Sequence, residues 1–211
     1  MSIKNDIKLL EKYGVKPIPY VIASDENAAI SAAKKLGYPV AIKIISPEIE
    51  HKTDFGAVKI GIGNEQALKL AYRDIIQNCR SKTKNAKIEG MLIQKMARKG
   101  VELIIGGKRD AQFGHMIVLG LGGIYVEIFR DISARLVPLT REDIQEMLSE
   151  LKSHPLLEGA RGKKPINKKA FETLVLKVAT LMTSENLKEM DLNPVVCDDK
   201  GCDIIDARFI R

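Results

Sequence analysis

The sequence predicts an α/β protein made of two α+β lobes. In the first half of the chain, segments with apolar residues at helical spacing alternate with short β-branched runs. In the second half, short strands follow one another between glycines and charged turns, which is typical of an antiparallel sheet. The length of 211 residues, 45% of them hydrophobic, is enough to bury one large core or two smaller ones.

The first lobe is predicted to span residues 1–96 and to open with a helix. Ile3, Ile7 and Leu10 have helical spacing, and Gly14 follows as a residue that commonly ends helices. The remaining elements of this lobe are expected to be strands at 17–23, 38–45, 57–63 and 91–96 and helices at 24–37 and 64–79.

The second lobe is predicted to span residues 97–211, with residues 94–100 linking the two lobes. Thr140 and Asp143 have the spacing of a capping box and predict a helix start. The other elements expected here are a helix at 167–185 and strands at 101–110, 115–123, 124–129, 188–198 and 202–209.

Composition excludes several classes of protein. The net charge of +7 invites a nucleic-acid reading, but 27 acidic residues are mixed with the 34 basic ones, and only residues 80–87 form a dense basic run. Aromatic residues make up 5%, too few for base-stacking surfaces. No apolar run approaches the length of a membrane span, and the N-terminus lacks the apolar block of a signal peptide. We therefore expect a cytoplasmic protein without membrane or nucleic-acid partners.

The three cysteines show no zinc-like spacing, so free thiols are expected. Cys197 and Cys202 flank a turn, which leaves a bridge across a hairpin open.

Lys43 lies within an apolar predicted strand, where a charged head group is normally excluded unless it has a partner. One interpretation places it on the solvent side of a half-buried strand. The other places it on a rigid strand to meet a nucleotide phosphate. The charged, glycine-containing segment 46–57 that follows favours the second interpretation.

Polar residues gather near the C-terminus. Asp191 and Asn193 are two residues apart and so share one face of a strand, and Asp206 is expected opposite them in a hairpin. Oxygen ligands on a rigid sheet suit Mg²⁺, which also takes substrate phosphates. A polar strand end without a metal is the alternative, and the combination with Lys43 favours the metal.

The glycine-rich segment 120–127 is a weaker signal. Glycines let backbone N–H groups approach a phosphate, but a glycine turn between strands is equally often just a tight turn. The spacing fits neither a Walker A loop nor the dinucleotide fingerprint.

Nearly the whole chain resembles the ATP-grasp β subunits of archaeal ADP-forming acetate-CoA ligases. The resemblance rests on "GYPVAIKIISPEIEHKTDFGAVKIGI", "GVELIIGGKRDAQFG", "LGLGGIYVEIFRDISARLVPL", "DLNPVV" and "IIDAR". Within these segments, "SPEIEHK" is the most specific part. The family implies an ATP-grasp fold whose two lobes enclose a nucleotide cleft.

The family also implies roles for single residues. His51 matches a histidine on a swinging loop that is transiently phosphorylated, and Asp191 matches an acid that steadies the phosphohistidine. Nucleotide binding is implied for Lys43, Gln94, Lys95, Met96, Ala97 and Glu102. A phosphate loop is implied for Gly122, Gly123 and Glu127, and magnesium ligation for Asn193 and Asp206.

The implied reaction is acyl-CoA + ADP + phosphate ⇌ acid + CoA + ATP, with ADP or ATP and Mg²⁺ bound by this chain. A separate CoA-binding α subunit is expected as the partner, in an α2β2 assembly. The main alternative is a non-catalytic, nucleotide-sensing ATP-grasp subunit of an acyltransferase-type complex. Retention of Lys43, His51, Asn193 and Asp206 together argues against that alternative.

Overall fold

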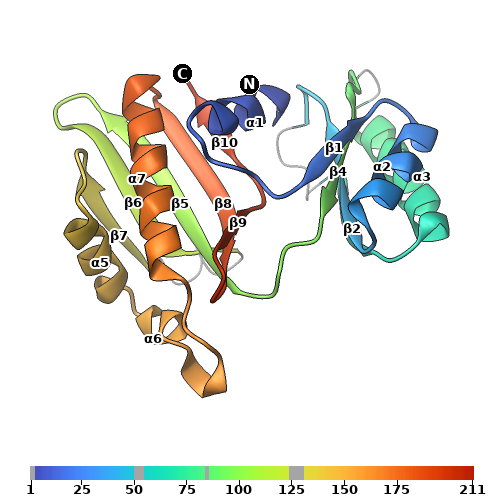
Figure 1. The fold of residues 1–211 in the computed structure, drawn as a ribbon. Coiled ribbons are helices and arrows are strands. Elements are labelled where there is room, and N and C mark those ends of the chain that lie inside the picture. The colour runs from blue at the N-terminus through green and yellow to red at the C-terminus, as the bar shows by residue number, and fades with distance from the viewer. Residues whose placement is uncertain (1–2, 50–54, 84–85, 124–130) are drawn as a thin grey trace. The chain divides into compact units, whose positions relative to one another are not determined.

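The structure is a computed structural model that describes residues 3–49, 55–83, 86–123 and 131–211 (Figure 1). The chain divides into two compact units. The small unit comprises residues 18–96, and the large unit comprises residues 3–17 together with residues 97–211.

The small unit is an antiparallel sheet with two helices. Its strand order is β1-β4-β2-β3. The bounds of its elements are β1 Tyr20–Ala23, α2 Glu26–Leu36, β2 Val40–Ile45, β3 Val58–Ile62, α3 Glu65–Lys82 and β4 Gly90–Lys95.

One face of this sheet carries the core of the small unit. Ile42 and Ile44 of β2 and Ile93 of β4 are buried in one cluster with apolar residues of α2 and α3. Because side chains alternate along a strand, Lys43, between Ile42 and Ile44, points to the opposite face.

The large unit is built on a second antiparallel sheet. Its strand order is β10-β8-β5-β6-β7, with β9 paired to β8. The bounds of its elements are α1 Ile3–Lys12, β5 Val101–Asp110, β6 Gly114–Leu121, β7 Ile132–Leu136, α5 Arg141–Glu150, α6 His154–Leu157, a 3₁₀ turn Ala160–Gly162, α7 Lys168–Ser184, β8 Glu189–Cys197, β9 Cys202–Ile204 and β10 Arg208–Ile210.

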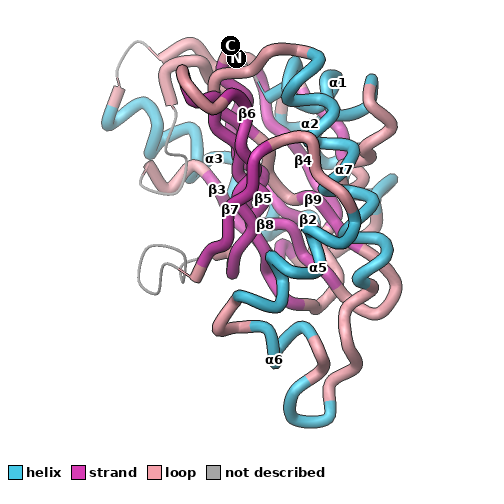
Figure 2. The backbone as a smooth tube through the Cα atoms, turned by 90° about the vertical axis from the view of Figure 1, so that its left-hand side faces the viewer, coloured by secondary structure: helices cyan, strands magenta, loops and turns pink. Residues whose placement is uncertain are grey.

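Helices α5 and α7 cover one face of this sheet, and Figure 2 shows both on the same side of its strands. Leu103 of β5, Ile117 of β6 and Leu192 of β8 are buried with Met147 of α5 and Phe171 of α7. The residues that alternate with these along the strands, including Asp191 and Asn193, therefore lie on the other face.

The N-terminal helix belongs to the large unit, which corrects the expectation that it is part of the first lobe. Leu9 and Leu10 of α1 are buried in the core of the large unit. Lys12 Nζ lies 2.6 Å from Glu185 Oε1, and Lys177 Nζ donates to the carbonyl of Gly14 at 2.8 Å. Helical spacing predicts that a face is buried, but it carries no information about which core buries it.

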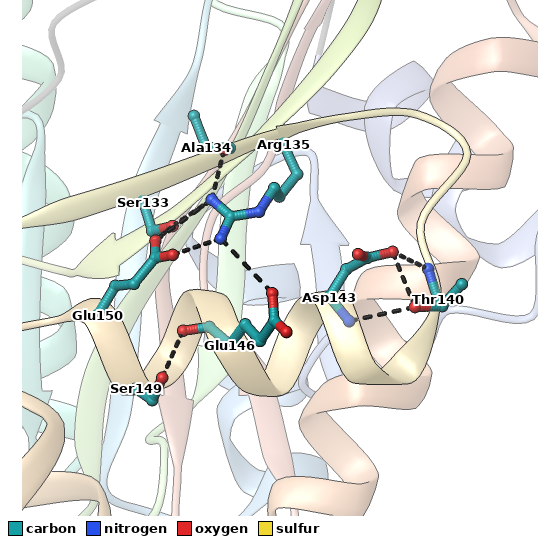
Figure 3. Close-up of polar contacts among 8 residues, drawn as sticks. All are labelled: Ser133, Ala134, Arg135, Thr140, Asp143, Glu146, Ser149 and Glu150. Atoms are coloured by element: carbon teal, nitrogen blue, oxygen red, sulfur yellow. Dashed lines mark hydrogen bonds and ion pairs between the residues drawn. The ribbon is translucent and has the colours of Figure 1, made fainter.

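Strand β7 was not predicted; it pairs with β6, and its polar side chains contact α5 (Figure 3). Both Nη atoms of Arg135 on β7 contact the carboxylate of Glu150 on α5, and the hydroxyl of Ser133 donates to the same carboxylate. The helix begins with the predicted capping box, in which the side chains of Thr140 and Asp143 each accept from the other's backbone N–H.

The predicted last strand is broken. Residues 205–207 separate β9 from β10, whereas one strand over 202–209 was expected. The break lies level with Pro194 of β8, which has no N–H to donate to a neighbouring strand. The cysteines are free thiols as expected, and Cys197 and Cys202 lie directly opposite each other across β8 and β9.

Within the described parts of the chain, no helix is both long and apolar enough to cross a membrane. The expected strand at 124–129 lies outside the described residues.

Candidate functional site

The glycines that follow β6 lie directly against the start of β5. The N–H of Gly122 donates to the carbonyl of Glu102 at 2.7 Å. A Cβ at Gly122 would lie 2.7 Å from the carbonyl oxygen of Leu103, and one at Gly123 would lie 2.3 Å from Oε2 of Glu102. Gly123 also has a φ of +70°. Both positions therefore require glycine, and they bring the carboxylate of Glu102 beside the glycine backbone.

Asn193 joins this cluster from β8. Its Oδ1 accepts a hydrogen bond from the backbone N–H of Gly123 at 3.3 Å. An amide oxygen has two lone pairs, so this contact leaves acceptor capacity for a second partner.

Asp206 lies level with Asn193, as expected from the sequence, but in the break between β9 and β10. The register is the same on both sides of the break, since Val195 pairs with Ile204 and Asp191 pairs with Arg208. The N–H of Ile205 donates to the carbonyl of Pro194 at 3.1 Å, which holds the chain close to β8 through the break.

Burial and neighbouring charged groups both shift the pKa of the Asp191 carboxyl group. Although the residue is exposed overall, burial around its carboxyl group raises the pKa of Asp191, and the carboxylate of Asp206 raises that pKa further. Arg208, opposite Asp191 on β10, acts in the other direction and lowers the pKa. Two carboxyl groups are thus close enough to repel each other.

This arrangement fits a magnesium ion. A divalent cation relieves repulsion between neighbouring carboxylates, and Asn193 adds an amide oxygen from the same region. The residues that the structure describes contain no group of three His, Cys, Asp or Glu side chains placed to hold a metal. Mg²⁺ keeps several waters and takes phosphate oxygens, so it needs only one or two oxygen ligands from the protein.

In the small unit, two polar side chains are buried on the sheet face opposite the helices. Lys43 is 5% exposed and Gln94 is 3% exposed. Lys43 pairs in register with Leu92 and Gln94 pairs with Ala41, so both belong to the β2–β4 pair at the centre of the sheet. A buried lysine and a buried amide on a sheet face need polar partners, and the face that carries both is a candidate binding site.

The predicted linker begins where β4 ends. Lys95 is the exposed last residue of β4, and Met96 and Ala97 follow outside regular structure. The sulfur of Met96 accepts from the N–H of Gly61 at 3.4 Å, which holds Met96 beside β3. The boundary between the two units falls between Met96 and Ala97.

Thus the structure brings Glu102, Gly122, Gly123 and Asn193 together, with Asp191 and Asp206 nearby on the same hairpin. Lys43, Gln94, Lys95 and Met96 belong to the small unit. His51 and Glu127 lie outside the described residues.

Arg208 was not singled out from the sequence. It lies opposite Asp191 and is the cation that acts on the Asp191 carboxyl group. Its position two residues after Asp206 was the available signal, because residues two apart in an extended segment face the same side.

Comparison with known proteins identifies the family. A family model described as an ATP-grasp domain matches residues 4–210. The chain is 42% identical over 205 residues to the β subunit of an ADP-forming acetate-CoA ligase I of Pyrococcus furiosus, covering 96% of this chain and 88% of that one. The chain belongs to the ATP-grasp family of the ADP-forming acetate-CoA ligases.

Solved structures of this ATP-grasp family are also similar. An acetyl-coenzyme A synthetase 1 of Candidatus Korarchaeum cryptofilum, in complex with coenzyme A and Ca-AMPCP, is 39% identical, with a TM-score of 0.95 over 100% of this chain and 92% of that one. A second structure of that enzyme, with Mg-AMPPCP and a phosphohistidine segment pointing towards the nucleotide site, is 37% identical, with a TM-score of 0.84 over 99% of this chain and 92% of that one. The expected ATP-grasp fold is confirmed.

Some relatives in the family are much longer. The ADP-forming acetate-CoA ligase I of Archaeoglobus fulgidus is 42% identical over 97% of this chain, yet the match covers 30% of that protein. This chain therefore corresponds to one part of the longer ligases.

Proposed function

We propose that this chain is the nucleotide-binding ATP-grasp subunit of an ADP-forming acyl-CoA ligase located in the cytoplasm. The proposed net reaction is acyl-CoA + ADP + phosphate ⇌ acid + CoA + ATP. The observation that carries the proposal is the large-unit cluster of Glu102, Gly122–Gly123 and Asn193 with two adjacent carboxyl groups. It belongs to a chain 42% identical to a β subunit of such a ligase.

In this proposal, the chain's own residues bind and orient the nucleotide. The buried Lys43 neutralises phosphate charge, and the segment Gln94–Ala97 holds the adenine base. Glu102 lies beside the glycine turn and takes part in nucleotide binding. The backbone N–H groups of the glycine loop that includes Gly122, Gly123 and Glu127 face the transferred phosphoryl group.

Asn193 and Asp206 hold Mg²⁺, which when bound neutralises the charge of the phosphates. The hydrogen bond from the N–H of Gly123 orients the Asn193 amide, and the second lone pair of Asn193 Oδ1 is left to bind the ion.

His51 carries the phosphoryl group. Neutral imidazole is nucleophilic at cellular pH, so His51 takes a phosphoryl group from the partner side and transfers it to the β-phosphate of ADP, which regenerates the neutral ring. Phosphoryl transfer requires donor and acceptor in line, and a histidine that travels with its loop meets this requirement at two distant sites. Asp191 steadies the phosphohistidine in this proposal.

The CoA-dependent steps belong to a partner. In the proposal, the partner subunit converts acyl-CoA and phosphate into acyl phosphate and free CoA, and then releases the acid as the phosphoryl group moves to histidine. Two β subunits of Pyrococcus furiosus ligases match this chain over 88% of their own length, which supports a separate CoA-binding α subunit. We propose an α2β2 assembly.

The test is co-purification of this chain with its partner from its own cells, followed by an assay of ATP formation from ADP, phosphate and a panel of acyl-CoA compounds. ATP formation that requires both subunits and Mg²⁺ is the expected result. A stable complex that binds MgADP tightly but forms no ATP with any acyl-CoA would contradict the proposal and favour a nucleotide-sensing subunit instead.

A further inference from the structure

Arg98 holds two carboxylates of the β8–β9 hairpin. Its Nε and Nη2 donate to Oδ2 and Oδ1 of Asp203 at 3.2 and 3.3 Å, and its backbone N–H donates to Oδ2 of the same residue at 3.4 Å. Its Nε also lies 3.3 Å from Oδ2 of Asp198, at the other side of the hairpin turn. All three residues belong to the large unit.

Gly100 provides a second, independent anchor two residues later. A Cβ at Gly100 would lie 2.3 Å from the carbonyl oxygen of Cys197 and 2.8 Å from its carbonyl carbon. The backbone at Gly100 therefore packs directly on the end of β8, and a side chain would force it away. Residues 98–100 are thus tied to the hairpin before β5 begins at Val101.

The same hairpin carries the candidate metal ligands. Asn193 lies on β8, and Asp206 follows β9 by two residues. A fixed connection therefore runs from Arg98 through Asp203 to the region of Asn193 and Asp206, within one unit of the protein.

We propose that Arg98 is a positioning residue for the nucleotide. The two guanidinium hydrogen bonds from Arg98 to Asp203 fix the backbone of Ala97 relative to Asn193 and Asp206 within the large unit. The inference rests on the proposed function, in which the segment ending at Ala97 holds the base. It adds a residue to that function and assigns Arg98 no part in the chemical step.

The guanidinium geometry suits this task. An exposed single ion pair contributes little, but here one planar group binds both oxygens of Asp203 and also reaches Asp198. The Arg98 side chain is 40% exposed, whereas those of Asp203 and Asp198 are 22% and 14% exposed. A lysine at this position keeps the positive charge but lacks the paired N–H donors of the planar guanidinium, so the Arg98→Lys variant separates the effect of charge from that of geometry.

The experiment measures binding of MgADP and MgGDP by calorimetry to the full chain and to four variants, Arg98→Ala, Arg98→Lys, Asp203→Asn and Lys99→Ala. ADP and GDP share their phosphates and differ only in the base. In the proposed function, backbone N–H and C=O groups of the segment Gln94–Ala97 bind adenine. These groups discriminate against guanine only if the position of the segment is fixed. Lys99→Ala is the matched control, because it removes a neighbouring exposed cation.

We expect MgADP to bind about 3- to 10-fold more weakly to Arg98→Ala and Asp203→Asn than to the wild type, with a smaller loss for Arg98→Lys and none for Lys99→Ala. The preference for ADP over GDP should fall in the same order, which a general loss of stability does not explain. Hydrogen exchange without nucleotide should show faster exchange of the Arg98 amide in Asp203→Asn.

The positioning role would be overturned if Arg98→Ala and Asp203→Asn both kept the MgADP affinity, the preference for ADP over GDP and the amide exchange rates of the wild type. Failure of the wild type to bind MgADP would overturn the proposed function, and with it the positioning role, while the exchange data would still report whether the contact between Arg98 and Asp203 orders the segment.

Discussion

The backbone N–H of Gly123 donates a hydrogen bond to Oδ1 of Asn193, 3.3 Å away, and so joins the glycine turn after β6 to the strand β8. The contact orients the amide group that we propose as a magnesium ligand. It also holds one end of the proposed phosphate loop, so both features depend on the Asn193 side chain.

Substitution Asn193→Ala should therefore reduce ATP formation by the assembled enzyme about 10- to 100-fold, because it removes a proposed ligand and frees the glycine turn. The Mg²⁺ concentration for half-maximal activity should rise. The control is Asn186→Gly, which removes an asparagine side chain elsewhere in the large unit while keeping its positive φ of 49° accessible. Equal activity of the two variants would remove Asn193 from the site.

Lys43→Met should lower kcat/KM for MgADP by about 100-fold, since a buried cation on a rigid strand is lost from the proposed phosphate site. Lys59→Met on the neighbouring strand β3 is the matched control, because Lys59 is 42% exposed and lies 3.9 Å from Asp74. Steady-state kinetics at several ADP concentrations measure the effect, and circular dichroism checks that both variants fold. A Lys43→Met enzyme as active as Lys59→Met would show that Lys43 does not contact the nucleotide.

Glu65, the first residue of α3, predicts a pH dependence of stability. A hydrogen bond from Lys34 at 2.8 Å and one from Lys69 at 2.7 Å lower the pKa of Glu65 from 4.5 to about 2. Because the folded protein favours the ionised form, this stabilisation is fully present above about pH 4.5 and is lost as the pH falls towards 2.

Glu65→Gln should accordingly lower the unfolding midpoint near neutral pH, and the difference from wild type should shrink as the pH falls from about 4.5 towards about 2. Thermal melts across this range measure it, with Glu89→Gln in the same unit as the control. A difference that stays constant with pH would show that the two lysines do not stabilise the ionised carboxylate.

The contact between Arg135 and Glu150 predicts how α5 is attached to the edge strand β7 (Figure 3). Glu150→Gln should lower the unfolding midpoint more than Glu146→Gln, because Glu146 lies 3.9 Å from Arg135 and is 70% exposed. In the Arg135→Ala background, the effect of Glu150→Gln should largely disappear. Equal effects in both backgrounds would mean that the pair contributes nothing to the attachment.

Sequence reasoning located the Asn193 and Asp206 pair because two local rules apply there. Alternation along a strand places Asp191 and Asn193 on one face, and a hairpin turn brings Asp206 level with Asn193. The break at residues 205–207 was also readable in principle, since Pro194 lacks an N–H. The apolar run around Lys43 left open whether its head group lies in water, and an exposure of 5% argues against that interpretation.

Long-range contacts were beyond such rules. The guanidinium of Arg98 contacts a residue 105 positions away, and α1 packs in a core whose members, apart from Tyr13 and Val15 just after the helix, begin at residue 101. Strand β7 was missed because Arg135 breaks its apolar pattern, and only the partner Glu150 on α5 explains a charge there. Local periodicity therefore predicted which face of a helix or strand is buried, but not which other helix or strand packs against that face.

The proposed reaction requires a phosphoryl group to pass through His51. Its most direct test is incubation of the chain and its partner with Mg²⁺ and ATP labelled at the γ-phosphate, followed by tryptic digestion. The wild type should carry an acid-labile label on the peptide spanning residues 44–52, and His51→Ala should carry none on this chain while still binding MgADP. A label of equal amount on this chain in His51→Ala would contradict this requirement.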